Sequence, residues 1–224
     1  MRLFTMDVSR LDPDDARWAE RVAAERLVRA RGFRNAAARA QTLGAGILLD
    51  EILRRHFPEV ARPAETACGA KGKPYLAGAP GLAVSWAHSG SLVALGIGAA
   101  AEGPVGVDVE RSGRARAEVA ARFFHPEETA WLAAQPEGRR DEAFTRLWAL
   151  KEAFTKALGE GISLGLSRFA VRFRGDAPEP VEWEGRRWGL RSWRLEGGCA
   201  AAFCAPEGAV FPDAPESVAL PAAE

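Results

Sequence analysis

The sequence lacks any long apolar segment, and its formal charges cancel. No apolar run approaches the roughly 20 residues that a membrane-spanning helix needs, and the N-terminus shows no charged-then-apolar signal sequence. The 30 basic and 30 acidic side chains leave a net charge of zero, which argues against a general nucleic-acid-binding protein. With 47% hydrophobic residues in 224, we expect a cytoplasmic globular protein of one or two domains that binds neither nucleic acid nor membranes.

Cysteine and lysine are both scarce. The three cysteines lack the spacing of a metal site, so we expect reduced thiols. Arginine supplies nearly all of the positive charge, and each lysine lies in a segment that carries other chemistry-bearing residues. The lysines are Lys71, Lys73, Lys151 and Lys156.

Two acidic residues alternate with valines in residues 105–110, VGVDVE. Strict alternation in a β-branched run predicts a strand. Val107 and Val109 then face the core, whereas Asp108 and Glu110 project together from the opposite face. A polar strand face is common, but two like charges one pleat apart repel each other, and a bound cation would relieve that repulsion.

A helix predicted over about 139–158 carries a third carboxylate. Trp148, Glu152 and Lys156 recur four residues apart and share one face, and glycines follow directly where the helix is expected to end. The apolar stripe lies on another face and consists of Phe144, Leu147, Phe154 and Leu158. An ordinary amphipathic helix with a Glu–Lys pair explains this pattern too. Three carboxylates without a nearby cysteine, however, suit Mg²⁺, which commonly keeps positions open for substrate phosphates.

The segments GVDVE at 106–110 and WALKEAFTK at 148–156 resemble the two-part signature of 4′-phosphopantetheinyl transferases, G-[VI]-D-[VI]-E and W-x-x-K-E-[AS]-x-x-K. Further similarity runs over nearly the whole chain, in GKPYL at 72–76, HSGSLVALGIG at 88–98, RFF at 122–124 and GISLGLSRFAVRF at 161–173. The length resembles the two-lobed, surfactin-synthetase-activating type, not the half-size holo-acyl-carrier-protein synthase, which trimerises. The resemblance therefore implies a monomer.

The resemblance implies an α+β fold of two similar αβ lobes related by pseudo-twofold symmetry. The chain itself repeats MDVSR at 6–10 as VDVER at 107–111. Each copy precedes two predicted helical stretches, about 15–29 and 36–57, then about 114–134 and 139–158. Strands follow at 82–86 and 92–97, with His88 at the tip of this hairpin, and near 164–173, 188–195 and 199–205. We expect an N-terminal lobe over 1–103, a C-terminal lobe over 104–205 and a loosely packed tail over 206–224.

The implied reaction moves the 4′-phosphopantetheine arm of coenzyme A to a serine of an apo acyl or peptidyl carrier protein, releasing adenosine 3′,5′-bisphosphate. Asp108, Glu110 and Glu152 would hold Mg²⁺ or Mn²⁺, and Lys156 would stabilise developing charge on phosphate. Glu152 is the candidate base for the serine proton, although the sequence leaves open which carboxylate takes it.

The resemblance also assigns binding residues. Coenzyme A contacts carry over to Arg26, Arg29, Thr42, Lys73, Pro74, His88, Asp108 and Lys156. The carrier would dock near Arg111, Arg114, Arg116 and Phe123, a basic segment that suits the acidic helix of a carrier. Two positions depart from close relatives: Gln41 stands where arginine is usual, and Ala87 where serine is usual, which removes polar contacts to the nucleotide.

Two other classes of function compete with this interpretation. A metal-dependent hydrolase would cleave the coenzyme A pyrophosphate with water at a similar metal site. A non-catalytic coenzyme A-binding module is disfavoured by the full set of three carboxylates with Lys156. The pathway that the carrier serves is not encoded in these motifs.

Overall fold

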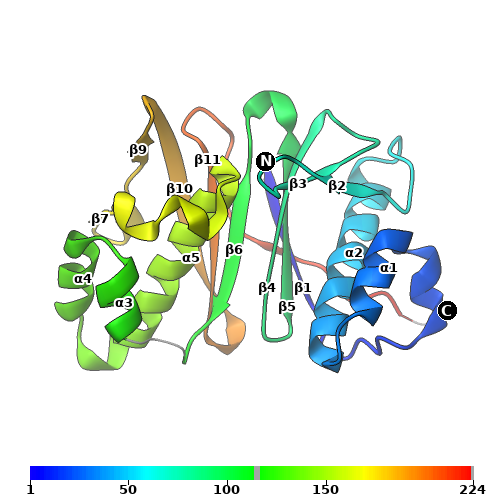
Figure 1. Ribbon diagram of the computed structural model, residues 1–224, viewed down its shortest axis with the longest axis horizontal. Coiled ribbons are helices and arrows are strands. Elements are labelled where there is room, and N and C mark those ends of the chain that lie inside the picture. The colour runs from blue at the N-terminus through cyan, green and yellow to red at the C-terminus, as the bar shows by residue number, and fades with distance from the viewer. Residues whose placement is uncertain (114–116, 223–224) are drawn as a thin grey trace.

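The chain forms two α+β lobes whose sheets lie between two outer groups of helices (Figure 1). This is a computed structural model, and it describes residues 1–113 and 117–222. The first sheet has the order β12-β1-β5-β4, and the second has the order β6-β11-β10-β9. Their strands are β1 (Arg2–Asp7), β4 (Leu82–Ser89), β5 (Leu92–Ala99), β12 (Glu216–Ser217), β6 (Gly106–Arg111), β9 (Val181–Trp183), β10 (Arg186–Leu195) and β11 (Cys199–Pro206).

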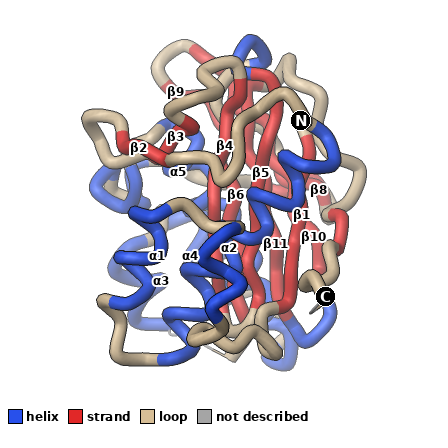
Figure 2. Tube along the Cα trace, turned by 90° about the vertical axis from the view of Figure 1, so that its right-hand side faces the viewer, coloured by secondary structure: helices blue, strands red, loops and turns tan. Residues whose placement is uncertain are grey.

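The helices cover the outer faces of the two sheets (Figures 1 and 2). They are α1 (Ala24–Arg31) and α2 (Ala36–His56) in the first lobe, and α3 (Ala117–Phe123), α4 (Pro126–Ala133) and α5 (Arg140–Leu158) in the second. Local signals set their ends: Asn35 caps α2 through its side chain, and Gly159 ends α5 in a left-handed conformation with φ 76°. Within the described part of the chain, no helix is both long and apolar enough to cross a bilayer.

Both lobes share one strand topology. In each lobe the first strand pairs antiparallel with the last strand of a hairpin, β1 with β5 and β6 with β11. The α+β fold of two similar lobes is therefore confirmed. The register differs from the one that the repeated pentapeptides suggest, because Phe4 pairs with Leu95 and Asp108 pairs with Ala202, each on the fourth residue of the last strand. The structural counterpart of Asp108 is thus Phe4 and not Asp7.

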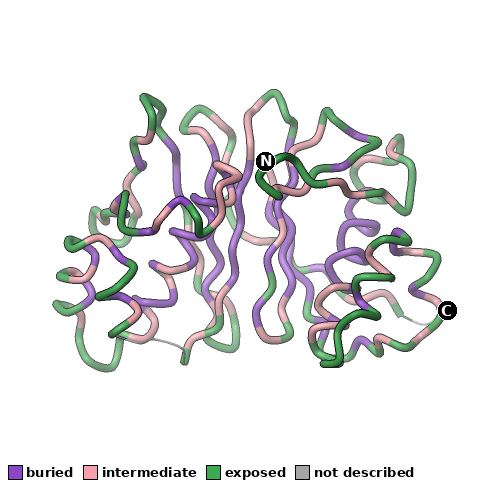
Figure 3. Tube along the Cα trace, viewed as in Figure 1, coloured by how far each residue is buried: buried purple, intermediate pink, exposed green. Residues whose placement is uncertain are grey.

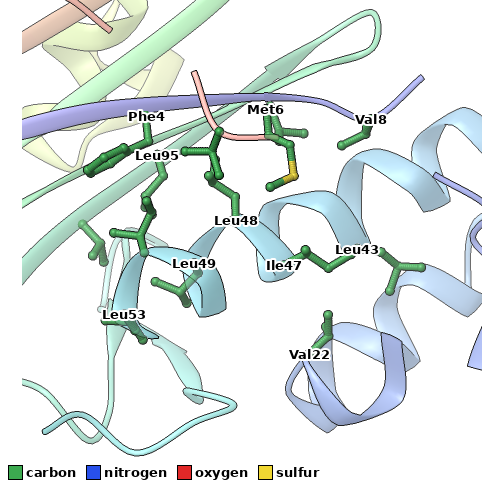
Figure 4. Packing of buried hydrophobic residues seen from close by; sticks show 14 of the residues in the cluster. Phe4, Met6, Val8, Val22, Leu43, Ile47, Leu48, Leu49, Leu53 and Leu95 are labelled. Atoms are coloured by element: carbon green, nitrogen blue, oxygen red, sulfur yellow. The ribbon is translucent and has the colours of Figure 1, made fainter. Parts of the chain in front are cut away.

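Three buried clusters hold the molecule together, and the strands at its centre are buried almost throughout (Figure 3). One lies between α2 and the first sheet, where Phe4 and Met6 contact the leucines of the helix (Figure 4). The second lies between α5 and the second sheet. The third joins the two sheets and includes Leu3, Val107 and Phe203. The predicted valine face of the 105–110 strand therefore packs against the other lobe.

Several local predictions are wrong. The tail is not loose, because β12 pairs with β1 and Val218 is buried, its N–H donating to Thr5. Residues 164–173 do not form the predicted strand: η4 (Gly161–Leu164) and η5 (Leu166–Arg168) occupy the first part, and only Phe173 lies in a strand, the two-residue β7 (Phe173–Arg174), although the apolar residues of the segment fill the second core. The first expected helix is divided into η1 (Ala16–Glu20) and α1. His88 lies within β4 and not at the hairpin tip.

Candidate functional site

The strand β6 runs unusually close to the helix α5, and Gly106 makes this possible. A Cβ atom at Gly106 would lie 1.9 Å from the carbonyl oxygen of Ala153 and 2.3 Å from the backbone nitrogen of Ala157. Only glycine permits that approach without moving backbone. The glycine that opens the GVDVE motif therefore has a packing role, which places Asp108, two residues further along β6, against the last turns of α5.

A cluster of charged side chains lies at this junction. The Nζ atom of Lys156 donates to Oδ1 of Asp108 at 2.6 Å. Glu152 lies one helical turn before Lys156, as the sequence predicts, and both Asp108 and Glu152 are buried. Among the residues that the structure describes, the other oxygen of Asp108, Oδ2, and Oε1 of Glu152 are buried and have no hydrogen-bond partner. Two orphaned carboxylate oxygens are costly in a folded protein, so they indicate a place where a ligand binds.

Glu110 is positioned by a residue that the sequence analysis did not single out. Ser89, at the end of β4, donates its hydroxyl to Oε2 of Glu110 at 3.0 Å and accepts the N–H of Arg111 at 3.1 Å. Ser85, on the same strand, accepts the N–H of Val107 at 3.1 Å. These serines join the edge strands of the two sheets. Their spacing of four along β4 puts both on one face, which is the only sequence signal for their role.

The electrostatics of the cluster follow from burial. Burial raises the pKa of Asp108 to about 7, although the Lys156 ammonium opposes this shift and the neighbouring Glu152 and Glu110 add to it. Burial likewise raises the pKa of Glu152, again against Lys156 and with a contribution from Glu110. A carboxylate whose pKa lies above its usual range accepts a proton more readily near neutral pH. The cluster is therefore suited to proton transfer next to an anionic group.

The donor chemistry of the cluster fits a hard divalent cation. Asp108 Oδ2 and Glu152 Oε1 are oxygen donors of the kind that Mg²⁺ prefers, and a cation would satisfy both. The predicted three-ligand set is not gathered, however: among residues 1–113 and 117–222, no group of three or more His, Cys, Asp or Glu side chains is placed to hold a metal ion. Asp108 Oδ1 instead accepts a hydrogen bond from Lys156, and Glu110 accepts one from Ser89.

Three of the predicted coenzyme A residues, Lys73, Pro74 and Lys156, line one pocket at the seam between the lobes, where residues of β4 and α5 face each other. A pocket of about 160 Å³ lies beside Lys156 and is lined by Lys73, Pro74 and Trp86, among others. The guanidinium of Arg26 lies over the Trp86 ring at 5.4 Å. The Thr42 hydroxyl already has a partner within its own helix, because it donates to the carbonyl of Ala38 at 2.8 Å.

Two of the predicted coenzyme A residues, Arg29 and Lys156, lie close enough to His88 to affect its pKa. Burial lowers the pKa of His88, and the positive charges of Lys156 and Arg29 lower it further. Its imidazole is therefore neutral at pH 7, which suits a hydrogen bond to a ligand better than an ion pair. Gln41, which stands where arginine is usual, donates to the carbonyl of Gly90 at 2.7 Å and so ties α2 to the hairpin turn beyond His88.

Lys73 occupies an unexpected position. Its Nζ atom donates to the carbonyls of Val105 at 3.0 Å and Ala157 at 2.9 Å, both in the second lobe. Burial lowers the pKa of its ammonium to about 8. Lys71, by contrast, is exposed and forms an ion pair with Glu160. The turn that carries Lys71 and Lys73 therefore connects the first lobe to the second next to the pocket.

The predicted docking residues are only partly described. Arg111 and Phe123 are exposed, Phe123 at 41%. Arg114 and Arg116 lie outside the described residues. Phe124, next to Phe123, is buried and stacks on Phe144 of α5 at a centroid distance of 5.4 Å. The RFF segment thus combines one exposed and one buried aromatic ring at the outer side of the second lobe.

Two lobes of one topology thus meet at a pocket beside Lys156, next to the orphaned carboxylate oxygens of Asp108 and Glu152. Comparison with known proteins identifies the family. Residues 104–204 match the family model of the 4′-phosphopantetheinyl transferase superfamily. The 4′-phosphopantetheinyl transferase psf-1 of Bacillus pumilus is 32% identical over 187 residues, covering 79% of this chain and 76% of the relative. The 4′-phosphopantetheinyl transferase Sfp of Bacillus subtilis (strain 168) is 26% identical over 217 residues, covering 96% and 94%.

The chain therefore belongs to the 4′-phosphopantetheinyl transferase superfamily and is a transferase, as its motifs predict. Solved structures of holo-(acyl-carrier-protein) synthases are also similar. One from Bacillus anthracis, in complex with CoA (3′,5′-ADP), is 20% identical with a TM-score of 0.41 and covers 46% of this chain and 93% of its own. These comparisons provide no support for the coenzyme A hydrolase that the motifs left open.

Proposed function

We propose that this protein transfers the 4′-phosphopantetheine arm of coenzyme A to a serine of an apo acyl or peptidyl carrier protein. The observation that carries the proposal is the contact of Lys156 with Asp108 beside the unpartnered oxygen of Glu152. The serine oxygen bonds to the phosphorus that bears the pantetheine arm, and the bridging pyrophosphate bond breaks. Holo carrier and adenosine 3′,5′-bisphosphate result, with the serine proton passing to a base.

Each residue of the cluster has one role in this scheme. Glu152 accepts the serine proton, because burial raises its pKa toward the working pH. Lys156, held by Asp108, offers its remaining N–H groups to the phosphate oxygens. A Mg²⁺ ion held by the unpartnered oxygens of Asp108 and Glu152 would neutralise charge on the pyrophosphate. Asp108 and Glu152 are buried, which strengthens the electrostatic interactions that they make.

We place coenzyme A in the seam, with its nucleotide toward the first lobe. Support comes from the pocket between Lys73, Pro74, Trp86 and Lys156, and from the neutral imidazole of His88. Arg26 and Arg29 add positive charge on the same side. The three free cysteines are consistent with a reducing compartment, and we propose that the protein acts in the cytoplasm as a monomer.

The decisive experiment supplies coenzyme A and Mg²⁺ to a panel of apo carriers and follows the mass of each carrier. A mass gain equal to phosphopantetheine on the carrier supports the transfer. Release of free phosphopantetheine without carrier modification would contradict it and indicate a hydrolase. Excess chelator should abolish the gain, and added Mg²⁺ or Mn²⁺ should restore it; full activity in chelator would contradict the metal assignment alone.

We further propose that the carrier docks on the segment from Arg111 to Phe123. The exposed side chains at both ends of this segment support the proposal, since a basic segment with an exposed ring suits an acidic helix. The variant Arg114→Glu with Arg116→Glu should raise the carrier KM and flatten its salt dependence, because exposed charges are screened beyond roughly 8 Å at physiological ionic strength. Arg186→Glu with Arg187→Glu, an equal charge change on exposed β10 residues, should leave both unchanged. Unaltered carrier kinetics in the first variant would place docking elsewhere.

A further inference from the structure

The lysine of the WALKE motif does not face the site that the motif's glutamate forms. Lys151 is fully buried. Its Nζ atom donates to both carboxylate oxygens of Glu128, at 2.6 and 2.7 Å, and to the carbonyl of Phe169 at 2.9 Å. All three donor positions of the ammonium are therefore used, and none is left for a substrate.

The partner carboxylate is saturated as well. Glu128 lies in the first turn of α4, and its two oxygens also accept the N–H of Val171 at 2.7 Å and the N–H of His125 at 2.9 Å. The pair thus connects three segments that are far apart in sequence: α5, the start of α4, and residues 169–171. One residue along α5, the Oε1 atom of Glu152 has no hydrogen-bond partner in the described part of the chain.

Aromatic rings extend this connection to α3. The Lys151 ammonium lies 4.0 Å from the ring centroid of Phe169 and 5.6 Å from that of Phe124. Phe124 directly follows the exposed Phe123 at the end of α3, and it packs on the rings of Phe144 and Trp148. The corner between α3 and α4 is therefore fixed to the same turn of α5 that carries Glu152.

A buried ion pair is a poor device for stability alone. Taking both charges out of water costs much of what their attraction returns, so apolar residues of similar volume often serve equally well. What the pair adds here is direction: three hydrogen bonds from Lys151 tie α5 to Glu128 and Phe169, and two more hold the Glu128 carboxylate in place, so that together they favour one rotation of α5 about its axis. Neighbouring residues of a helix point about 100° apart, so a roll of α5 displaces Glu152 and Lys156 from Asp108.

We propose that Lys151 and Glu128 are positioning residues, which set the rotation of α5 that aims Glu152 and Lys156 at Asp108 and hold the α3–α4 corner against the same helix. The inference rests on the proposed transfer reaction. It assigns the motif lysine a role away from phosphate, and it adds Glu128, which lies outside both motif halves, to the residues on which turnover depends.

The test is Glu128→Gln, which keeps the shape of the side chain and removes its charge. We expect kcat to fall about 100-fold, as for a misplacement of catalytic groups by roughly 1 Å, with an unchanged dissociation constant for coenzyme A. The matched control is Glu127→Gln, the same change one residue earlier on α4. Glu127 pairs with Arg172 on the surface, so this variant should keep wild-type kcat. Both are compared where circular dichroism shows them fully folded.

A purely structural pair would lower the melting temperature and leave kcat per folded molecule unchanged, which would overturn the inference. If Glu128→Gln does not fold, the double variant Lys151→Met with Glu128→Gln removes both charges. It should fold and still turn over slowly, whereas wild-type kcat in it would overturn the inference. Wild-type protein that modifies no carrier overturns the proposed function as well; an active wild type with an equally active Glu128→Gln overturns the positioning role only.

Discussion

The two lobes place opposite kinds of side chain at equivalent positions. Phe4 and Met6 of β1 face α2 and lie in the first core, whereas Asp108 and Glu110, at the matching positions of β6, face α5. In the first lobe, therefore, the contact between the sheet and the helix is apolar at these positions. The second lobe has carboxylates at the same positions. Within the described residues, one oxygen of Asp108 and one of the nearby Glu152 have no hydrogen-bond partner. One topology thus serves as a scaffold in one copy and carries the site in the other.

The carboxylates of the first lobe behave differently. Asp50 and Glu51 of α2 are buried too, but arginines surround them: Glu51 accepts hydrogen bonds from Arg54 at 2.6 Å and from Arg21 and Arg55 at 2.7 Å. The bond from Arg54 is the main reason why the pKa of Glu51 falls to about 2. Burial alone does not mark a functional carboxylate; what distinguishes Asp108 and Glu152 is burial without sufficient counter-charge.

The largest expected effect comes from replacing the carboxylate of one lobe, and the apolar residue at the equivalent position of the other, by alanine. Asp108→Ala should lower kcat by about 10³-fold with little loss of stability, because a costly buried charge is removed. Phe4→Ala should keep kcat and lower the free energy of unfolding by about 3–5 kcal/mol through the cavity it leaves. Steady-state kinetics and urea unfolding of both variants check this. A Phe4→Ala variant that loses turnover while folded would break the comparison.

Gly106→Ala should have the next largest effect. Its Cβ would meet the backbone of α5, so we expect a loss of about 3 kcal/mol together with slower turnover, since β6 must move away from the helix. Gly44→Ala is the control in the first lobe, where the three atoms nearest to the new Cβ belong to the side chains of Val8 and Leu11, the nearest at 2.3 Å, and not to the backbone. It should lose less stability and no activity. Equal kcat in the two variants would show that the close approach of β6 and α5 is not needed for turnover.

Glu51→Gln separates the paired carboxylates from the unpaired ones. The folded pKa of about 2 lies below the ordinary value of 4.5, so the charge stabilises the folded protein above pH 4.5, and this contribution disappears as the pH falls toward 2. At pH 7 the variant should unfold about 2–3 kcal/mol more easily, with unchanged kcat. Denaturant unfolding at several pH values should show the gap closing below pH 4.5. A gap that stays constant down to pH 2 would contradict the assignment.

The smallest effect is expected at the nucleotide end. His88→Ala should raise the KM for coenzyme A about tenfold, the result of one lost hydrogen bond, and leave the carrier KM unchanged. Lys73→Ala should act in the same direction, and less so with dephospho-coenzyme A if the lysine reaches the 3′-phosphate. His56→Ala is the control, because His56 stacks on Phe4 away from the seam. Equal changes in both KM values would argue against binding of the nucleotide by the first lobe.

The sequence alone was enough for the family, the two-lobed α+β fold, the helices α2 and α5, and the face that Asp108 and Glu110 share. The family and the two-lobed fold follow from the resemblance of the motifs to a known family, and the helices and the shared strand face follow from periodicity, which is a local property of the chain. It was also enough to bring Lys156 and Glu152 to one face of α5, because the helical repeat determines that.

Tertiary structure decided the rest. The pentapeptide repeat misaligned the lobes, because strand register depends on the hairpin partner and on which face is buried. A slip of one residue moves every side chain of a strand to the opposite face. The tail at 206–224 looked loose because its pairing partner, β1, lies at the other end of the chain. Ser89, Lys73 and the Lys151–Glu128 pair have roles that arise only where distant segments meet. No local pattern encodes whether a buried charge finds its counter-charge, and in this protein that difference separates the scaffold from the site.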